Sequence, residues 1–195
     1  MLGIVLCGGQ SMRMGSDKGL LVEQDRPWAE IAKEKLNQLD IPVMISVNVQ
    51  QYQSYAHLFL PEELIADDPS VVVQGPLRGL LSAHLCKPDQ DIFLLACDLL
   101  LMERRLLEKL LGVFDRHITF DAFIYTRAGQ REPLCGIYRS GALKSVLQLM
   151  ANQELGTSSM KFVLSKLKVM EIPLEEEEVR FFGNFNSPLD RDQLH

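Results

Sequence analysis

The residues best suited to chemistry lie in one short stretch near the start of the chain. Residues 8–18 read GGQSMRMGSDK and include three glycines, two serines, Arg13 and Lys18. Glycine lets backbone N–H groups approach a ligand because no Cβ stands in the way, and neighbouring N–H groups can form a concave nest for an anion. Arg13 and Lys18 add two full positive charges. The stretch therefore predicts a polyphosphate site, with an ordinary glycine-rich turn between a strand and a helix as the alternative.

Two common phosphate-binding loops do not fit this stretch. A Walker A loop has its lysine directly after the last glycine and then Ser or Thr. Here Lys18 comes three residues after Gly15 and is followed by Gly19. The dinucleotide-binding fingerprint, with its three spaced glycines, is also absent from the stretch. The pattern therefore indicates a phosphate-binding loop of another kind.

A further candidate, Asp98, comes two residues after an apolar run from Ile92 to Ala96. A run without alternation of polar and apolar residues is typical of a central parallel strand that is buried on both faces. A carboxylate at the carboxyl end of such a strand faces the crevice in which open α/β sheets bind their ligands. Mg²⁺ prefers carboxylate, water and phosphate oxygens, so the position predicts a magnesium ligand. The alternative is that Asp98 only caps the next helix.

Strands and helices must alternate along the chain to position these residues. Apolar and β-branched runs predict strands, and apolar residues at helical spacing predict helices between them. The predicted strands cover residues 2–7, 43–47, 92–96, 121–126, 134–138 and 169–172, and the predicted helices start near Pro27, Gly75, Glu103, Ala142 and Met160. We expect a single α/β domain over residues 1–195, with a mostly parallel sheet and helices on both faces. Pro27 is expected in the first turn of its helix, and the acidic run Glu175–Glu178 is expected to be a solvated loop.

Composition and charge exclude several classes of function. Of the 195 residues, 47% are hydrophobic and 24% charged, which is typical of a globular protein. The net charge of −6 argues against a nucleic acid or an anionic membrane as the main partner. The four histidines lack the spacing of zinc ligands. The four cysteines form no C-x-x-C pair and are expected to be reduced, mostly as core residues. No signal peptide or membrane-spanning run is recognisable, so a cytoplasmic location is expected.

The complete loop pattern, GGxSxRMGxDK, resembles the signature of the nucleotidyltransferase superfamily, and within it that of the molybdenum cofactor guanylyltransferase family. Further segments are similar to motifs of this family: G-P-L-x-G at residues 75–79, C-D at residues 97–98, and N-x-N-S-P-x-D at residues 184–190, where the family has threonine in place of Ser187. The resemblance extends in order over the whole chain. It implies the three-layer, Rossmann-like fold of the nucleotide-diphospho-sugar transferases.

The resemblance also implies a reaction. Members of the family transfer GMP from GTP to the terminal phosphate of molybdopterin and release pyrophosphate, so the expected substrates are GTP and molybdopterin and the expected cofactor is Mg²⁺. Transient contacts with proteins that make or receive the molybdenum cofactor are implied too. The implied catalytic residues are Arg13, Lys18 and Asp98, with Asp98 as metal ligand. The implied nucleotide-binding residues are Leu6, Cys7, Gly8, Gly9, Ser11, Arg13, Lys18, Asn48, Asp67, Asp68, Gly75, Pro76, Leu77, Gly79 and Asp98. The implied acceptor-binding residues are Pro133, Asn184 and Asn186.

Several of these residues have an alternative role on local grounds. Asn48 could simply cap the short helical piece that follows it. Asp67 and Asp68 compete for one nucleotide contact, with Asp68 narrowly preferred, and either could cap a turn. The segment around Pro133 fits a plain edge hairpin nearly as well as an acceptor-binding strand.

Two other functions stay open at this point. A CTP-dependent cytidylyltransferase that acts on molybdopterin or another phosphorylated acceptor belongs to the same superfamily, although the pair Gly8–Gly9 favours the guanylyl branch. The family usually continues C-D-x-P after its metal-binding aspartate, whereas Leu99 and Leu100 follow Asp98 here. This departure raises the alternative of a catalytically quiet, nucleotide-binding adaptor.

Overall fold

The strands of the chain assemble into one mixed sheet. The structure is a computed structural model that describes residues 1–7, 17–157 and 159–183. Within these residues, seven strands form a sheet in the order β5-β4-β1-β6-β8-β7-β9. The strands are β1 (Leu2–Leu6), β4 (Val43–Val47), β5 (Leu64–Ala66), β6 (Ile92–Ala96), β7 (Ala122–Arg127), β8 (Gln130–Tyr138) and β9 (Val169–Pro173). The pairs β5–β4, β4–β1, β1–β6 and β7–β9 are parallel, which confirms the predicted, mostly parallel sheet.

The strand β1 lies at the centre of the parallel half. Leu6 pairs with Ser46 of β4 on one side and with Ala96 of β6 on the other. Every residue of β1 and β6 is buried, as expected for parallel strands with uninterrupted apolar runs. Because β5, β4, β1 and β6 all run in the same direction, their carboxyl ends meet at one edge of the sheet.

The strands β7 and β8 form a hairpin in the other half of the sheet, but β8 lies between β6 and β7, so this is not the plain edge hairpin that was the alternative for the Pro133 segment. Its turn consists of Ala128 and Gly129, which both have positive φ (47° and 76°), as two-residue hairpin turns often require. The strand β8 starts at Gln130, earlier than predicted. It runs antiparallel to β6, with Cys135 opposite Leu95, so its first residues extend toward the carboxyl end of β6.

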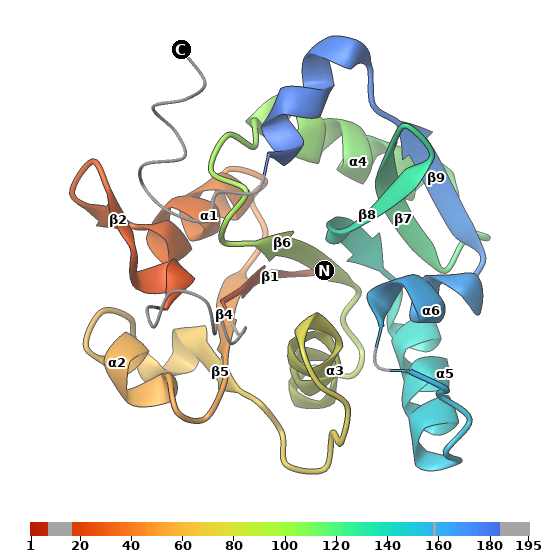
Figure 1. Cartoon of the computed structure of the whole chain (residues 1–195), viewed down its shortest axis with the longest axis horizontal. Coiled ribbons are helices and arrows are strands. Elements are labelled where there is room, and N and C mark those ends of the chain that lie inside the picture. Colours follow the sequence, from red (N-terminus) through yellow and green to blue (C-terminus); the bar gives the residue numbers. More distant parts are fainter. Residues whose placement is uncertain (8–16, 158, 184–195) are drawn as a thin grey trace.

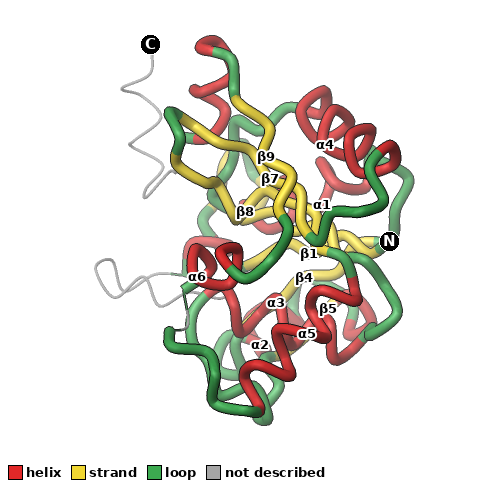
Figure 2. Tube along the Cα trace, turned by 90° about the vertical axis from the view of Figure 1, so that its right-hand side faces the viewer, coloured by secondary structure: helices red, strands yellow, loops and turns green. Residues whose placement is uncertain are grey.

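Helices cover both faces of the sheet, as predicted (Figure 1). The helices α1 (Trp28–Asn37) and α4 (Arg104–Arg116) lie on one face, and α3 (Pro76–Cys86), α5 (Ser140–Ala151) and α6 (Met160–Ser165) lie on the other. Side chains of β1 alternate between two cores, with Val5 packed under α1 and α4 and Ile4 packed under α3 and α5. The view in Figure 2 shows the sheet between these two layers. The short helix α2 (Tyr52–Ala56) adds Tyr55 to the core under α1.

A small hairpin precedes α1 and corrects the prediction for Pro27. The strands β2 (Val22–Glu23) and β3 (Arg26–Pro27) pair in a separate two-stranded sheet. Pro27 therefore ends β3, directly before the helix, instead of lying in its first turn. Strands of two residues are too short to show an alternating pattern in the sequence.

The prediction of a solvated loop at Glu175–Glu178 is correct for the exposure of the first three carboxylates and wrong for Glu178 and for the loop conformation. This run starts the 3₁₀ helix η3 (Glu176–Phe182), and Glu178 is only 3% exposed. The Glu178 carboxylate accepts hydrogen bonds from Lys109 Nζ at 3.0 and 3.2 Å. A run of like charges is usually solvated, but a cation from α4 lets this one carboxylate enter the protein.

The cysteines and the helices agree with two simpler predictions. All four cysteines are free thiols; Cys7, Cys97 and Cys135 are buried, whereas Cys86 is exposed. In the part of the chain that the structure describes, each helix is too short or too polar to cross a lipid bilayer.

Candidate active site

Four residues singled out in the sequence lie along one edge of the sheet. Cys7, Asn48, Asp67 and Asp98 come after the carboxyl ends of β1, β4, β5 and β6, respectively. Because these strands are parallel neighbours, the residues follow the edge in the order Asp67, Asn48, Cys7 and Asp98. This is the edge at which open α/β sheets bind ligands.

The two predicted catalytic residues that the structure describes are in contact. Lys18 Nζ donates a hydrogen bond to Asp98 Oδ2 at 3.0 Å. The side chains are 23% and 16% exposed, so the pair is accessible from solvent yet largely enclosed. Lys18 is the last residue of the predicted phosphate loop and the first residue of the 3₁₀ helix η1 (Lys18–Leu20). The fold therefore brings a cation and a carboxylate together at the strand ends.

Asp98 does not cap the helix that follows it. The helix α4 starts at Arg104, and its N-cap residue is Glu103. Asp98 instead lies in a turn in which the Leu99 N–H donates to Ala96 O at 3.3 Å. The alternative role as a helix cap is thus wrong, and the carboxylate is available for a ligand.

A lysine from α1 supports the turn that replaces the usual C-D-x-P. Lys35 Nζ donates hydrogen bonds to Leu100 O at 2.8 Å and to Met102 O at 2.6 Å. Burial lowers the pKa of Lys35 from its ordinary value of 10.5. The carbonyl groups after Asp98 are therefore held by a side chain of α1.

Asp98 fits a divalent metal ion whose other ligands would be substrate phosphates and water. In residues 1–7, 17–157 and 159–183, no group of three or more His, Cys, Asp or Glu side chains could hold a metal ion by itself. A single carboxylate is enough for Mg²⁺, which usually binds one or two carboxylates, substrate phosphates and water. Asp98 is the residue that would hold such an ion.

Asp17, next to Lys18, makes contacts that the sequence did not reveal. Its Oδ1 accepts hydrogen bonds from Gly19 N at 3.0 Å and from the Tyr55 hydroxyl at 2.9 Å. Its Oδ2 accepts one from Gln51 Nε2 at 2.7 Å. Asp17 stands in the loop pattern, but nothing in the sequence links it to Gln51 and Tyr55. Those two residues are four positions apart and therefore lie on the same side of one helical turn.

Asn48 takes the capping role that was its alternative. Its Oδ1 accepts a hydrogen bond from Gln51 N at 2.9 Å, and Gln51 Oε1 accepts one from Asn48 N at 3.1 Å. These reciprocal bonds start the turn that leads into α2. A nucleotide contact by Asn48 stays a prediction. It would have to use the side-chain NH₂ group, because Oδ1 already accepts a hydrogen bond from Gln51 N.

Asp67 and Asp68 have different surroundings. Asp67 Oδ2 lies 3.5 Å from Arg78 Nε, and its side chain is 13% exposed. Burial raises the pKa of Asp67, and Arg78 partly offsets this effect. Asp68 Oδ1 instead accepts hydrogen bonds from Ser70 N at 2.8 Å and Ser70 Oγ at 2.5 Å, which lower the pKa of Asp68. Asp68 therefore caps a local turn, whereas Asp67 forms an ion pair with α3.

The G-P-L-x-G segment forms the start of α3. Gly75 has a φ of 67°, a conformation that favours glycine, and Pro76 is the first residue of the helix. Gly79 packs so closely that a Cβ there would lie 2.5 Å from Leu6 Cδ1 and 2.8 Å from Ser46 Oγ. The side chains of Leu6 and Leu77 are buried in the core. A ligand at this segment would therefore meet backbone groups.

Of the remaining predicted site residues, the structure describes only Pro133. Pro133 lies half-buried on β8, and its carbonyl accepts a hydrogen bond from the Tyr138 hydroxyl at 2.7 Å. It stands two residues before the partner of Leu95 and hence toward the carboxyl end of β6. The predicted residues Gly8, Gly9, Ser11, Arg13, Asn184 and Asn186 lie outside the described residues.

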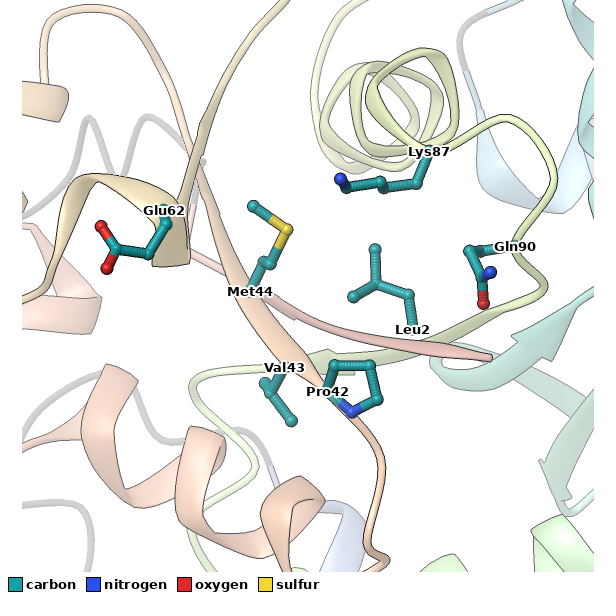
Figure 3. Close-up of a pocket in the computed structure, with 7 residues that line it drawn as sticks. All are labelled: Leu2, Pro42, Val43, Met44, Glu62, Lys87 and Gln90. Atoms are coloured by element: carbon teal, nitrogen blue, oxygen red, sulfur yellow. The ribbon is translucent and has the colours of Figure 1, made fainter.

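A pocket at the opposite edge of the sheet is not the candidate site (Figure 3). Its lining residues are Leu2, Pro42, Val43, Met44, Glu62, Lys87 and Gln90. Leu2 and Val43 are the first residues of β1 and β4. The pocket thus lies at the amino ends of the strands, whereas Lys18 and Asp98 meet at the carboxyl ends.

Comparisons with known proteins agree with this geometry. The model of a family described as the MobA-like NTP transferase domain matches residues 3–169. A probable molybdenum cofactor guanylyltransferase of Geobacillus sp. (strain WCH70) is 30% identical over 197 residues, which cover 100% of this chain and 97% of that protein. A molybdenum cofactor guanylyltransferase of Ectopseudomonas mendocina (strain ymp) is 29% identical and covers 95% of this chain and 87% of its own.

A solved structure confirms the predicted fold. The crystal structure of molybdopterin-guanine dinucleotide biosynthesis protein A from Archaeoglobus fulgidus has a TM-score of 0.79 with this chain, at 22% identity. The match covers 99% of this chain and 96% of the archaeal one. At this identity the match establishes the fold, and the family model and the curated relatives establish the relationship.

Proposed function

This chain belongs to the MobA-like NTP transferase family, and we propose that it transfers GMP from GTP to the terminal phosphate of molybdopterin and releases pyrophosphate. The names of the relatives support the choice of GTP and of the molybdenum cofactor. The observation that carries the proposal is the contact between Lys18 and Asp98 at the carboxyl edge of the parallel strands. The seven strands of one sheet span residues 2–173, which supports a single nucleotidyltransferase domain over residues 1–195.

The reaction is a displacement at the α-phosphorus of the nucleotide. The attacking phosphate of the acceptor is already anionic near neutral pH, so the enzyme needs no strong general base. The enzyme must instead align the acceptor with the α-phosphorus and neutralise the charge that grows on the leaving pyrophosphate. Lys18 supplies a positive charge at this point, and Arg13 is proposed to supply another. Asp98 would hold Mg²⁺, which supplies further charge neutralisation on the phosphate oxygens.

The remaining edge of the sheet would bind the nucleoside. We place Asp67, rather than Asp68, at the nucleotide, because the backbone N–H and the hydroxyl of Ser70 both already donate hydrogen bonds to Asp68. Backbone groups at Gly75, Pro76 and Leu77 would face the nucleotide together with those of Leu6, Cys7, Gly8 and Gly9. The side chains of Asn48 and Ser11 are the other proposed contacts.

The acceptor would bind on the side of Asp98 that faces β8. Pro133 lies on this strand, and Asn184 and Asn186 are proposed as further acceptor ligands on the basis of the family pattern alone. Brief contacts with the proteins that make or receive the cofactor, and a cytoplasmic location consistent with four free thiols, belong to the same proposal.

The proposal is tested by measuring pyrophosphate release from GTP, CTP and ATP, each with Mg²⁺ and with molybdopterin as acceptor. We expect release from GTP that depends on molybdopterin, and little release from the other two nucleotides. Release from CTP at an equal rate would overturn the choice of base. Tight GTP binding without any release on addition of molybdopterin would overturn the enzymatic function.

A further inference from the structure

We propose that Tyr55 and Gln51 are positioning residues that act through Asp17 to hold Lys18 opposite Asp98. The inference rests on the proposed function, because it assigns a supporting role around the same catalytic lysine. It draws on three elements: η1 with Lys18, the turn into α2 with Gln51, and α2 itself with Tyr55.

The Asp17 carboxylate is fixed by donors on both of its oxygens. Oδ1 accepts from Tyr55 at 2.9 Å, and Oδ2 accepts from Gln51 Nε2 at 2.7 Å. Oδ1 also accepts from Gly19 N at 3.0 Å, which makes Asp17 the N-cap of η1. Lys18 is thus the residue between a tethered aspartate and a tethered glycine, so its backbone has little freedom to turn away from Asp98.

The Tyr55 hydroxyl is suited to be a permanent donor. Tyr55 is fully buried, and burial raises the pKa of its hydroxyl well above the ordinary value of 10.0, with nearby Cys7 and Asp17 acting in the same direction. The hydroxyl therefore stays protonated near neutral pH and can donate to Asp17. The hydroxyl also packs tightly against Gly19, because a Cβ added to this glycine would lie 2.1 Å from the Tyr55 oxygen.

Gln51 connects this support to the strand ends. Its Nε2 also donates to Cys7 O at 3.4 Å, and its Oε1 accepts from Asn48 N at 3.1 Å. One amide side chain therefore joins the ends of β1 and β4 to the segment that carries Lys18. This connection matters because a shift of about 1 Å at a reacting group can lower a rate by about a hundredfold.

The same geometry assigns Asp17 a role different from that of Asp98. Three donors occupy the two oxygens of Asp17: Gln51 and Tyr55 from α2 and the turn before it, and the N–H group of Gly19 in η1. Asp98 is directed toward Lys18 at the strand edge. We therefore infer that Asp17 positions the lysine and does not bind the metal.

The test compares Tyr55→Phe with Tyr52→Phe. Tyr55→Phe removes only the hydroxyl that Asp17 accepts from. Tyr52 lies on the same helix, and its hydroxyl makes no hydrogen bond within the described residues, so Tyr52→Phe is the matched control. We expect Tyr55→Phe to lower kcat/KM for GTP by about tenfold, and Tyr52→Phe to leave it within about twofold of the wild type. Thermal unfolding of both variants shows whether the fold is intact at the assay temperature.

A double-mutant cycle with Lys18→Ala separates positioning from a general structural role. If Tyr55 acts through Lys18, Tyr55→Phe should lower kcat/KM by less than about twofold once the lysine is absent. The variant Gln51→Met, which removes the donor on the other carboxylate oxygen, should behave in the same way. A tenfold loss in both backgrounds, or no loss in the wild-type background, would overturn the inference.

Binding of inorganic pyrophosphate in the presence of Mg²⁺ gives a readout that needs neither the base nor the acceptor. Tyr55→Phe should weaken this binding when Lys18 is present and leave it unchanged in Lys18→Ala. A wild-type protein that binds pyrophosphate and turns over GTP, with equal effects of Tyr55→Phe in both backgrounds, would overturn this inference alone. A wild-type protein that neither binds pyrophosphate nor turns over GTP would overturn the proposed function, and the inference with it.

Discussion

Lys18 Nζ and Asp98 Oδ2 lie 3.0 Å apart, although 80 positions separate the two residues in the sequence. The two residues belong to different parts of the chain: Lys18 starts η1, which comes after β1, and Asp98 comes two residues after β6. The contact exists because β1 and β6 are parallel neighbours, which sets their carboxyl ends side by side. Phosphate and metal are the natural partners of a cation and a carboxylate at such a point.

Removal of either residue should affect catalysis far more than stability. We expect Lys18→Ala and Asp98→Ala each to lower kcat/KM for GTP by about two to three orders of magnitude, because each loses charge stabilisation at the reacting phosphates. The free energy of unfolding should change by less than about 1 kcal/mol, since partly exposed ion pairs contribute little. Pyrophosphate release and urea unfolding measure the two quantities.

The ion pair between Lys33 and Glu63 offers a control for this prediction. Its side chains are 18% and 27% exposed, close to the values for Lys18 and Asp98, but Lys33 lies on α1 and Glu63 precedes β5. Lys33→Ala should leave turnover within about twofold of the wild type. Full activity in Lys18→Ala or Asp98→Ala would contradict the assignment of the site.

The two neighbouring aspartates should respond differently to the same substitution. Asp67→Asn removes the charge that faces Arg78, and we expect it to raise KM for GTP about tenfold. Asp68→Asn keeps a side-chain oxygen that can still accept the hydrogen bonds from Ser70, so its effect should be smaller than about threefold. Steady-state kinetics with GTP distinguish the two, and a larger effect from Asp68→Asn would reverse the assignment.

Lys35 should matter for activity more than for stability. Lys35→Met removes the two hydrogen bonds that hold the carbonyl groups of Leu100 and Met102 next to the Asp98 turn. It also removes a buried charge whose desolvation lowers the pKa of Lys35, so we expect the free energy of unfolding to change by no more than about 1 kcal/mol. We expect kcat to fall about tenfold, because the turn that carries Asp98 loses its support.

The conservative variant Lys35→Arg retains a donor and should recover part of this loss. Kinetics and thermal unfolding of both variants decide the matter. Equal kcat values for the wild type and Lys35→Met would show that the leucine-rich turn positions Asp98 without help from α1.

Glu178 should make stability depend on pH in a defined direction. Burial alone would raise the pKa of Glu178, but the Glu175 N–H group and Lys109 outweigh burial and lower it below the ordinary value of 4.5. A carboxyl group with a lower pKa in the folded state stabilises the protein above its unfolded-state pKa, and this contribution disappears as the pH falls through the folded-state pKa.

The variant Glu178→Gln tests this dependence. We expect it to be less stable than the wild type by about 1–3 kcal/mol at pH 7, with the difference shrinking below pH 4.5 as the wild-type carboxylate takes up its proton. Urea unfolding between pH 3 and pH 7 measures the difference. Glu177→Gln, in the same acidic run but exposed, should show no such dependence, and a constant difference for Glu178→Gln would contradict the prediction.

The sequence by itself predicted most of the longer strands and helices in their order, and it predicted Lys18 and Asp98, which the structure brings together. The apolar runs of β1 and β6 and the residue types at Lys18 and Asp98 carry this information locally, because burial on both faces and phosphate binding each need particular residues at particular spacings.

Only the tertiary structure decided which distant side chains support that site. Asp17 meets Tyr55, Lys35 meets the carbonyl of Leu100, and Lys109 meets Glu178 because separate elements pack against each other. No local pattern marks such partners, since a polar side chain is stabilised in a buried place by whatever donor or acceptor the fold brings to it. The strand order, which sets Asp98 beside the end of β1, depends in the same way on the packing of the whole chain.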